Sequence, residues 1–223
     1  MNLSLLLPKN PFNVTPEKQT KAVKREGMPM WLQRIAAAAI LLLLSPLILT
    51  AMLAVKLDSR GPIVFSQVRI GAFGRRFRCY KLRSMYLATD PKFREPNPEE
   101  SSREGVCKKY VNDPRITPVG RIIRKLSIDE LPQLFNVVKG DMALVGPRPH
   151  LVSEFEQYDA SIYPRLHCQA GLTGLWQVSG RADTTFDEQM SLDNSYVEKQ
   201  SFIMDMLILL KTVPAVMFAK GAY

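Results

Sequence analysis

An uncharged apolar stretch dominates the hydrophobic pattern in the first quarter of the chain. The 21 residues from Ile35 to Val55 are mostly Ala, Leu and Ile and carry no charge. At about 1.5 Å per residue, a straight helix of this length spans roughly 30 Å, which matches the apolar core of a bilayer. The stretch is too long and begins too late to be a secretory signal peptide. It therefore predicts a membrane segment over residues 31–57.

The middle of this segment predicts a break in the helix. Pro46 has no amide hydrogen to donate and crowds the carbonyl of Leu42, while Ser45 can donate a hydrogen bond to a carbonyl that the break leaves free. Five Lys/Arg against two Glu precede the segment in residues 1–30, and ten Lys/Arg against two Asp follow it in residues 56–94. Because positive charge favours the cytoplasmic side at both ends, we expect a re-entrant helix–break–helix that enters one leaflet and returns. A single kinked transmembrane helix is the alternative.

The rest of the pattern predicts a mostly helical α+β domain over residues 58–223, preceded by a basic N-terminal arm over residues 1–30. We expect a basic helix over 17–26, strands over 61–70 and 76–83 joined by a turn at 71–74, a surface loop over 91–104, helices over 120–125 and 129–139, helix or coil over 154–162, a glycine-rich loop over 171–181, and helices over 186–200 and 202–219. The last helix is apolar but interrupted by charges and a proline, so it should lie in the membrane interface as an amphipathic helix.

Composition narrows the class of partner. Lys and Arg outnumber Asp and Glu by 30 to 21 in the 223 residues, which gives a net charge of +9. This balance fits nucleic acid, an anionic membrane surface or phosphorylated substrates. Nucleic acid is disfavoured, because the basic residues lack interleaved aromatic side chains on which bases could stack. Cys79, Cys107 and Cys168 show neither pairing nor metal-type spacing, which fits a reducing compartment and assigns them no chemistry.

The candidate chemistry begins with two adjacent carboxylates, Asp129 and Glu130, at the expected start of a helix. Ser127 and Glu130 also have the spacing of a capping box, in which case both acids would only complement the helix dipole. Arg124 precedes the pair and Arg148 follows it. Carboxylates between arginines suit a site for a metal-bound diphosphate, because an acid can hold Mg²⁺ or attack phosphorus while guanidinium groups neutralise phosphate oxygens.

Further basic residues extend this candidate site. Arg148 lies in a Gly-Pro-Arg-Pro sequence whose prolines fix φ on both sides, so the turn could hold one guanidinium with little loss of entropy. Lys81, Arg83 and Arg181 are candidate phosphate ligands, and solvated surface charges are the equally open alternative.

Several sequence blocks together resemble the bacterial sugar transferase family, the monotopic polyprenyl-phosphate hexose-1-phosphate transferases (phosphoglycosyl transferases). The blocks are Tyr-Lys-Leu-Arg-Ser-Met at 80–85, Asp-Pro-Arg-Ile-Thr-Pro-Val-Gly-Arg-Ile-Ile-Arg at 113–124, Ser-Ile-Asp-Glu-Leu-Pro-Gln-Leu at 127–134, Lys-Gly-Asp-Met at 139–142, Gly-Pro-Arg-Pro at 146–149 and Gly-Leu-Thr-Gly-Leu-Trp-Gln-Val-Ser-Gly-Arg at 171–181. Together with the Ser-Pro break, they occur in the order of the family and cover most of residues 31–223. The short N-terminal arm predicts the small, stand-alone form.

The resemblance implies a mechanism in two displacements. Asp129 would attack the sugar-side phosphorus of a UDP-sugar and release UMP, and undecaprenyl phosphate would then take the sugar phosphate from the aspartate. Glu130 would be a catalytic Mg²⁺ ligand, and Arg124, Arg148 and Arg181 match phosphate- or nucleotide-contacting positions. The resemblance also implies a bacterial inner (cytoplasmic) membrane location with the catalytic domain facing the cytoplasm, and a role in starting an exopolysaccharide, O-antigen or glycoprotein glycan. Homo-oligomerisation is left open.

Two other classes of function remain as alternatives at this stage. A basic membrane scaffold would bind anionic lipid and catalyse nothing, and Asp129 would then be dispensable. A membrane-associated hydrolase of nucleotide-sugars or lipid diphosphates would use water in place of the lipid acceptor.

Overall fold

The computed structural model of the protein describes residues 27–101, 110, 112–157, 160–180 and 184–218. Its helices are α1 (Met30–Leu43), α2 (Ser45–Asp58), α3 (Pro118–Lys125), α4 (Gln133–Lys139), α5 (Val152–Phe155), α6 (Leu175–Ser179), α7 (Phe186–Lys199) and α8 (Phe202–Met217). Its 3₁₀ turns are η3 (Ala72–Gly74), η4 (Pro98–Glu100), η5 (Ile128–Glu130) and η6 (Ala160–His167). Its strands are β1 (Val64–Ile70), β2 (Arg76–Leu82), β3 (Ala143–Val145), β4 (His150–Leu151) and β5 (Gly171–Thr173). The predicted α+β, mostly helical class is confirmed.

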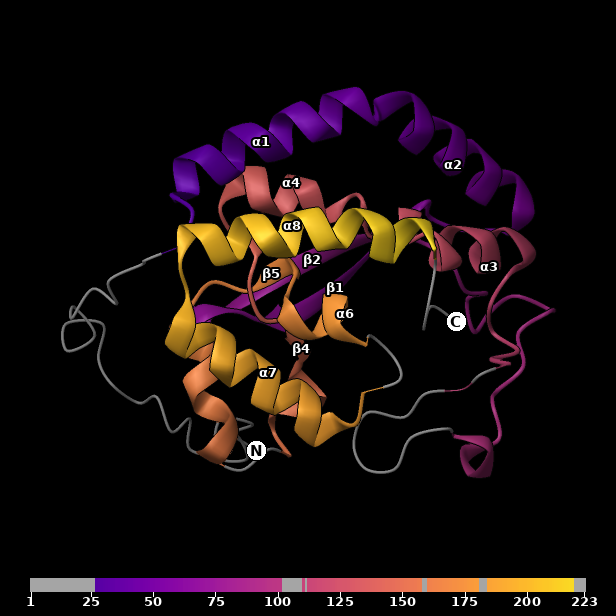
Figure 1. Cartoon of the computed structure of the whole chain (residues 1–223). Coiled ribbons are helices and arrows are strands. Elements are labelled where there is room, and N and C mark those ends of the chain that lie inside the picture. The colour runs from indigo at the N-terminus through magenta and orange to yellow at the C-terminus, as the bar shows by residue number, and fades with distance from the viewer. Residues whose placement is uncertain (1–26, 102–109, 111, 158–159, 181–183, 219–223) are drawn as a thin grey trace, which may run out of the picture.

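The first two helices form an arch over one side of the domain (Figure 1). They meet at Leu44 with a bend of 62°, at the predicted break. The Ser45 hydroxyl donates to the carbonyl of Leu42 at 2.7 Å, which satisfies an acceptor that Pro46 leaves without its amide partner. Within the described residues, no single helix is long and apolar enough to cross a membrane, whereas this bent pair passes that test by length and composition together.

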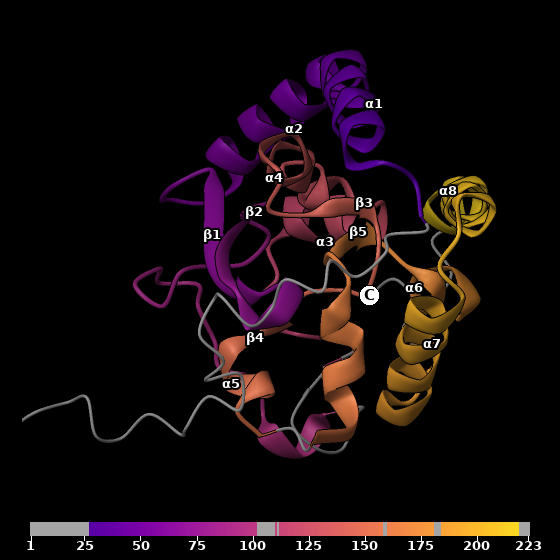
Figure 2. The ribbon, with the colours of Figure 1, turned by 90° about the vertical axis from the view of Figure 1, so that its left-hand side faces the viewer.

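Two small sheets lie beneath the arch. The predicted hairpin is present, with β1 and β2 antiparallel from Val64 opposite Leu82 to Ile70 opposite Arg76. Strand β4 adds antiparallel to the end of β1, giving the order β2-β1-β4. Strands β3 and β5 form a separate parallel pair. Figure 2 shows the hairpin on one side of the molecule and α7 and α8 on the other.

The main core lies between α1, α4, β3 and the last helices. Ala37 of α1, Leu134 and Val137 of α4, and Met142 and Leu144 at β3 are fully buried in one cluster. A second, smaller cluster joins α2 to α3 and the end of β2. The proposed membrane helices therefore pack directly on the elements that carry the candidate site.

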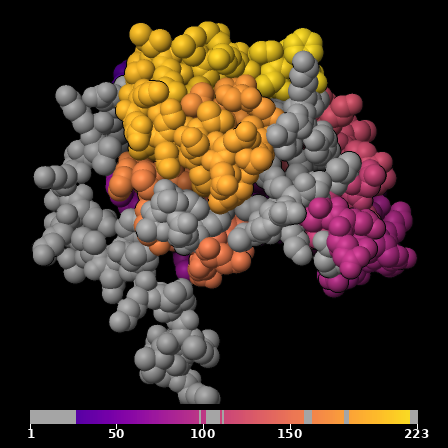
Figure 3. Space-filling model, turned by 60° about the horizontal axis from the view of Figure 1, so that its bottom comes forward, coloured from indigo at the N-terminus to yellow at the C-terminus, as the bar shows by residue number. Residues whose placement is uncertain are grey.

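A buried polar network ties both ends of the described chain together. Asp205 of α8 is completely buried and accepts hydrogen bonds at 2.7 Å from the Tyr196 hydroxyl of α7 and from the amide of Met28, just before α1. One of the charges that interrupt the apolar pattern of the last helix therefore points inward. Figure 3 shows α7 and α8 on one side of the lower face of the molecule and the segment around η4 on the other.

The structure corrects several sequence predictions. The expected helix over 129–139 is divided into η5 and α4, because Pro132 has no amide with which to continue the ladder. The expected loop over 171–181 instead contains β5 and α6, and the segment over 154–162 holds α5 and the beginning of η6. Helices α3, α7 and α8 are confirmed. The basic helix predicted over 17–26 lies outside the described residues.

Candidate active site

Asp129 and Glu130 lie in the 3₁₀ turn η5, between α3 and α4. Ser127 begins this turn with a left-handed backbone (φ 54°), and its side chain forms no capping hydrogen bond. The amide of Glu130 instead donates to the Ser127 carbonyl, and the Glu130 carboxylate is bound by cations. The capping-box alternative is therefore wrong, and both carboxylates are available for other roles.

The Glu130 carboxylate is held between two cations from different elements. Its Oε1 accepts from Lys81 Nζ of β2 at 2.6 Å and from Arg148 Nη2 at 2.7 Å, and its Oε2 accepts from Arg148 Nη1 at 3.2 Å. Burial alone would raise the pKa of Glu130, but Arg148 and Lys81 hold it well below the ordinary value. Glu130 is therefore ionised at any physiological pH.

The Asp129 carboxylate has the opposite environment. It is 6% exposed and accepts no hydrogen bond from any residue that the structure describes. Burial raises its pKa to about 6; the neighbouring charge of Glu130 adds to this, and Lys81 and Arg124 oppose it. An anion without hydrogen-bond donors keeps its lone pairs free, so at neutral pH Asp129 is an ionised carboxylate suited to attack.

Asn136 of α4 joins the helix that follows these carboxylates to β2, the strand that carries Lys81. Its side chain is fully buried, donates to the Arg78 carbonyl at 2.7 Å and accepts from the Tyr80 amide at 3.1 Å. These bonds fasten α4 to the edge of β2, next to the residue that contacts Glu130.

Arg148 reaches Glu130 from the turn between β3 and β4. The turn packs so closely on β5 that a Cβ on Gly146 would lie 2.3 Å from the Gln169 carbonyl, and a Cβ on Gly171 would lie 2.1 Å from the Gly146 amide. Only glycine permits this approach of two backbones. The prediction that this sequence forms a rigid turn is thus consistent with its packing.

Buried donors without acceptors lie on the two elements that flank the carboxylates. Arg124 of α3 reaches the Ser84 hydroxyl only weakly, at 3.5 Å, and its Nε is buried without an acceptor in the described structure. Gln133, the first residue of α4, is 2% exposed, and its Nε2 also lacks an acceptor there. Such donors are costly unless a ligand satisfies them. Phosphate oxygens are acceptors of the required kind.

The remaining predicted residues lie elsewhere. The Arg83 guanidinium is buried beneath the end of α2, where it donates to the carbonyls of Val55, Ser59 and Pro62. The structure thus brings together Asp129, Glu130, Lys81, Arg124 and Arg148, and places Arg83 in a structural contact. Arg181 lies outside the described residues.

The carboxylate oxygens of Asp129 and Glu130 fit a Mg²⁺ site of the kind that leaves coordination positions open for water and substrate. No cluster of three or more His, Cys, Asp or Glu side chains occurs in the described part of the chain. Mg²⁺ does not need one, since it commonly takes one or two carboxylates and completes its shell with water and substrate phosphate. Asp129 and Oε2 of Glu130 retain free lone pairs, whereas Oε1 of Glu130 is occupied by Lys81 and Arg148.

Sequence reasoning missed the residues that support the site. Asn136 and Gln133 place polar amides at buried positions of a predicted helix. For Asn136, the sequence offered one sign of a special role, which is the poor helix propensity of asparagine. Arg165 and Asp193 form a buried ion pair at 2.6 Å between η6 and α7. They are far apart in sequence, so no local pattern joins them.

Comparison with known proteins identifies relatives over nearly the whole chain. The model of the bacterial sugar transferase family matches residues 25–219. The exopolysaccharide production protein ExoY of Rhizobium meliloti is 42% identical over 192 residues, which cover 85% of each chain.

Two further relatives carry names that describe a reaction. The undecaprenyl-phosphate galactose phosphotransferase of Salmonella typhimurium is 43% identical over 85% of this chain and 40% of its own. The UDP-glucose:undecaprenyl-phosphate glucose-1-phosphate transferase of Caulobacter vibrioides is 41% identical over 85% of this chain and 69% of its own.

Proposed function

Because the chain belongs to the bacterial sugar transferase family, we propose that it is a phosphoglycosyl transferase that moves a hexose 1-phosphate from a UDP-sugar to undecaprenyl phosphate and so starts an exopolysaccharide or related glycan. The observation that carries the proposal is the pairing of Asp129 and Glu130. The Asp129 carboxylate is buried and accepts no hydrogen bond within the described part of the chain, and the Glu130 carboxylate is fixed by Lys81 and Arg148.

The proposed reaction has two displacements at the same phosphorus. A carboxylate oxygen of Asp129 attacks the sugar-side phosphorus of the UDP-sugar, and the bond from this phosphorus to the bridging oxygen breaks, releasing UMP. A phosphate oxygen of undecaprenyl phosphate then attacks the phosphorus, and the bond to Asp129 breaks. The product is an undecaprenyl-diphosphate sugar, and the carboxylate is regenerated. Splitting the transfer allows donor and acceptor to use one site in turn.

The surrounding cations have separate proposed tasks. Arg124 and the neighbouring amide of Gln133 hold buried donors that find no acceptor among the described residues, so they would bind oxygens of the transferred phosphoryl group. Arg148 and Lys81 keep Glu130 ionised and in place. Mg²⁺ held at Glu130 would neutralise charge on the diphosphate and on the leaving UMP. Arg181 remains a predicted nucleotide contact.

The proposed location is the inner (cytoplasmic) membrane, with α1 and α2 as a re-entrant anchor over residues 31–57 and the catalytic domain over 58–223 on the cytoplasmic side. The bend of 62° and the exposed leucines of both helices support this arrangement. Labelling of cysteines introduced before α1 and near Asp129 tests it. Finding the two positions on opposite sides of the membrane would contradict the re-entrant anchor.

The deciding experiment measures UMP release from a panel of UDP-sugars by the purified protein with Mg²⁺ and undecaprenyl phosphate. We expect release with a suitable donor, loss of release in Asp129→Asn, and a mass increase of one sugar phosphate on the wild-type protein when the acceptor is omitted. Equal UMP release by the Asp129→Asn variant would exclude Asp129 as the nucleophile. UDP-sugar consumption without lipid product would indicate the hydrolase, and no consumption of any donor would favour the scaffold.

A further inference from the structure

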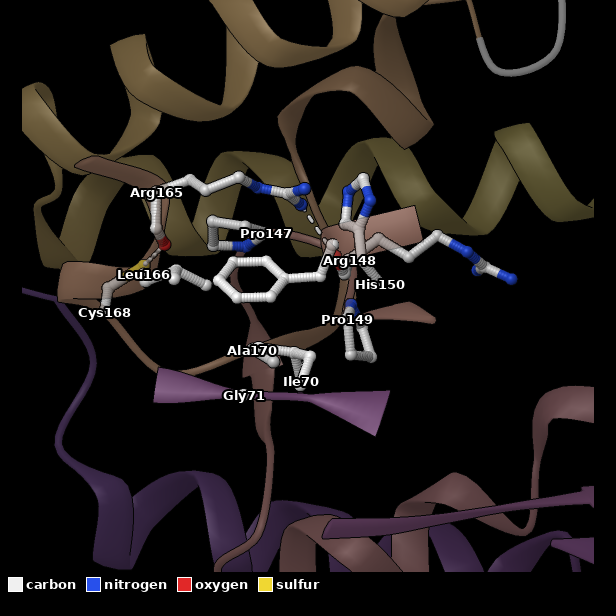
Figure 4. A pocket seen from close by; sticks show the side chains of 11 residues that line it. Ile70, Gly71, Pro147, Arg148, Pro149, His150, Arg165, Leu166, Cys168 and Ala170 are labelled. Carbon is white, nitrogen blue, oxygen red and sulfur yellow. Dashed lines mark hydrogen bonds between the residues drawn. The ribbon is translucent and has the colours of Figure 1, made fainter. Parts of the chain in front are cut away.

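Two other arginines donate hydrogen bonds to backbone carbonyls of the turn that carries Arg148. Arg165 Nη2 donates to the Arg148 carbonyl at 2.7 Å, and Arg69 Nη1 of β1 donates to the Pro149 carbonyl at 3.1 Å. Figure 4 shows the Arg165 guanidinium pointing at the backbone of Arg148, while the Arg148 side chain extends away to the other side. The backbone of the turn is therefore fixed on one side, while the Arg148 guanidinium contacts Glu130 on the other.

Arg165 is itself fixed by a buried counter-charge. It is 3% exposed and pairs at 2.6 Å with Asp193 of α7, which is 1% exposed. Met190, also on α7, contacts the second terminal nitrogen. A buried ion pair is a poor device for stability alone, because apolar residues of similar volume often stabilise a core as well or better. The contact also places the Arg165 guanidinium between Asp193 and the Arg148 carbonyl.

The backbone of Arg148 explains what this donor can control. Arg148 precedes Pro149, whose ring restricts it to extended conformations. The Arg148 carbonyl lies in the peptide plane that joins Arg148 to Pro149, so fixing its orientation limits rotation about the Cα–C bond of the residue that carries the guanidinium. A hydrogen bond to that carbonyl removes the remaining freedom of the turn, since the glycine at its start is already packed on β5.

We infer that Asp193 and Arg165 are positioning residues of the transferase, which act on the reaction by fixing Arg148 against Glu130. The contacts run from Asp193 to Arg165, from Arg165 to the Arg148 carbonyl, and from the Arg148 guanidinium to Glu130. Helix α7, whose residues the proposed mechanism does not use, is thereby coupled to the catalytic pair. The inference rests on the proposed function, because its readout is the transfer reaction.

The test replaces the ion pair by apolar residues in the double variant Arg165→Met, Asp193→Leu. We expect the rate of transfer at enzyme excess to fall roughly 10- to 100-fold, as is usual when a catalytic group is displaced by about 1 Å. The matched control is Thr185→Ala, which removes the cap of α7, where the Thr185 hydroxyl accepts from the Glu188 amide at 3.2 Å, and leaves the ion pair intact. The control should lower the melting temperature and leave the rate within about twofold of wild type.

The same double variant is then made in an Arg148→Lys background, with rates again measured in a single turnover. If the pair acts through Arg148, its removal should cost less than about twofold there. A loss of equal size in both backgrounds would overturn the inference, as would wild-type rates in the double variant. Should the double variant fail to fold, the single variant Arg165→Lys, which keeps a positive charge beside Asp193, takes its place. Its effect is then compared in the wild-type and Arg148→Lys backgrounds. Failure of the wild type to transfer would instead count against the proposed function.

Discussion

The carboxylates of Asp129 and Glu130 belong to consecutive residues, but among the cations that the structure describes, hydrogen bonds are donated only to that of Glu130. Burial therefore has opposite outcomes for the two groups. At Glu130 the charges of Arg148 and Lys81 outweigh burial and hold the pKa well below its ordinary value. At Asp129 burial prevails and raises the pKa to about 6. Divergent pKa values in one pair of acids are a common sign of divided catalytic roles.

The first residue-scale prediction concerns pH. The pKa of Asp129 is raised, so the ionised form that the proposed mechanism needs is present above about pH 6 and is lost as the pH falls through that value. We expect kcat/KM for the UDP-sugar to be flat at pH 7–8 and to decrease about tenfold per pH unit well below pH 6. Steady-state rates of UMP release between pH 5 and 8 provide the check. A plateau that extends to pH 5 would contradict the assignment.

The second prediction concerns stability. A carboxyl whose pKa is higher in the folded protein than in the unfolded chain stabilises the fold at low pH, and this contribution is lost as the pH rises from the ordinary value of 3.8 to about 6. The difference corresponds to roughly 3 kcal/mol. Asp129→Asn should therefore increase the free energy of unfolding at pH 7 by about 1–3 kcal/mol while abolishing transfer. Urea unfolding at pH 7 and pH 4 tests this, since the gain should shrink at the lower pH.

At this scale, the sequence located the chemical groups but not their supports. Asp129, Glu130, Arg124 and Arg148 lie in short motifs, so their residue types and spacing already indicate phosphate chemistry. Arg83 lies two residues beyond Lys81 and carries the same signal, yet it binds carbonyls at the end of α2. β2 ends at Leu82, between these two cations, so they face different surroundings. The end of a strand depends on tertiary packing, which the local sequence does not reveal.

At the scale of elements, the site depends on how α4 is joined to β2. Asn136 provides the joint, with one hydrogen bond to a carbonyl and one from an amide of the strand. Elements whose own pattern is strong, such as the hairpin and α7, agree with the sequence prediction. Strands β3 and β5 and helix α6 do not, because each is short and exists only through its partner: β3 pairs with β5 across a crossover, and three glycines let the backbones meet.

We predict that Asn136→Leu will weaken both the fold and the reaction. The substitution leaves the partly buried Arg78 carbonyl and Tyr80 amide without partners, which costs up to about 3 kcal/mol for each group. Chemical denaturation should show a loss of roughly 2–5 kcal/mol, and the protein that remains folded should transfer more slowly because Lys81 shifts against Glu130. Asn97→Ala, which removes an exposed cap of the short turn η4, is the control and should lower stability by no more than about 1 kcal/mol. An equal effect of both substitutions would contradict the role of Asn136 in joining α4 to β2.

At the scale of the whole molecule, the proposed anchor and the catalytic domain form one packed body. The Gln33 side chain of α1 accepts from the Leu144 amide of β3 at 2.7 Å, and Arg34 donates to the Val138 carbonyl at the end of α4 at 2.7 Å. Asp205 joins Met28, two residues before α1, to α7 and α8. The height of Asp129 relative to the anchor is therefore set by the fold, as a reaction between a dissolved donor and a lipid phosphate requires.

The last prediction follows from the side of the molecule that the core leaves uncovered. Leu43 at the end of α1 is 78% exposed and Leu53 of α2 is 60% exposed, as the proposed membrane anchor requires of side chains that face lipid. Placing Leu43→Glu and Leu53→Glu in one chain should reduce co-sedimentation with membranes, because a charge within the bilayer costs about 2.5–3.5 kcal/mol per residue. Transfer to a short, detergent-dispersed polyprenyl phosphate should be preserved, since both side chains point away from the catalytic core. Phe73→Glu, at an exposed aromatic in the hairpin turn, should leave membrane binding unchanged. Unaltered sedimentation of the double variant would contradict a membrane role for the arch, whereas loss of transfer in detergent would mean that the arch supports the fold of the site rather than its place at the membrane.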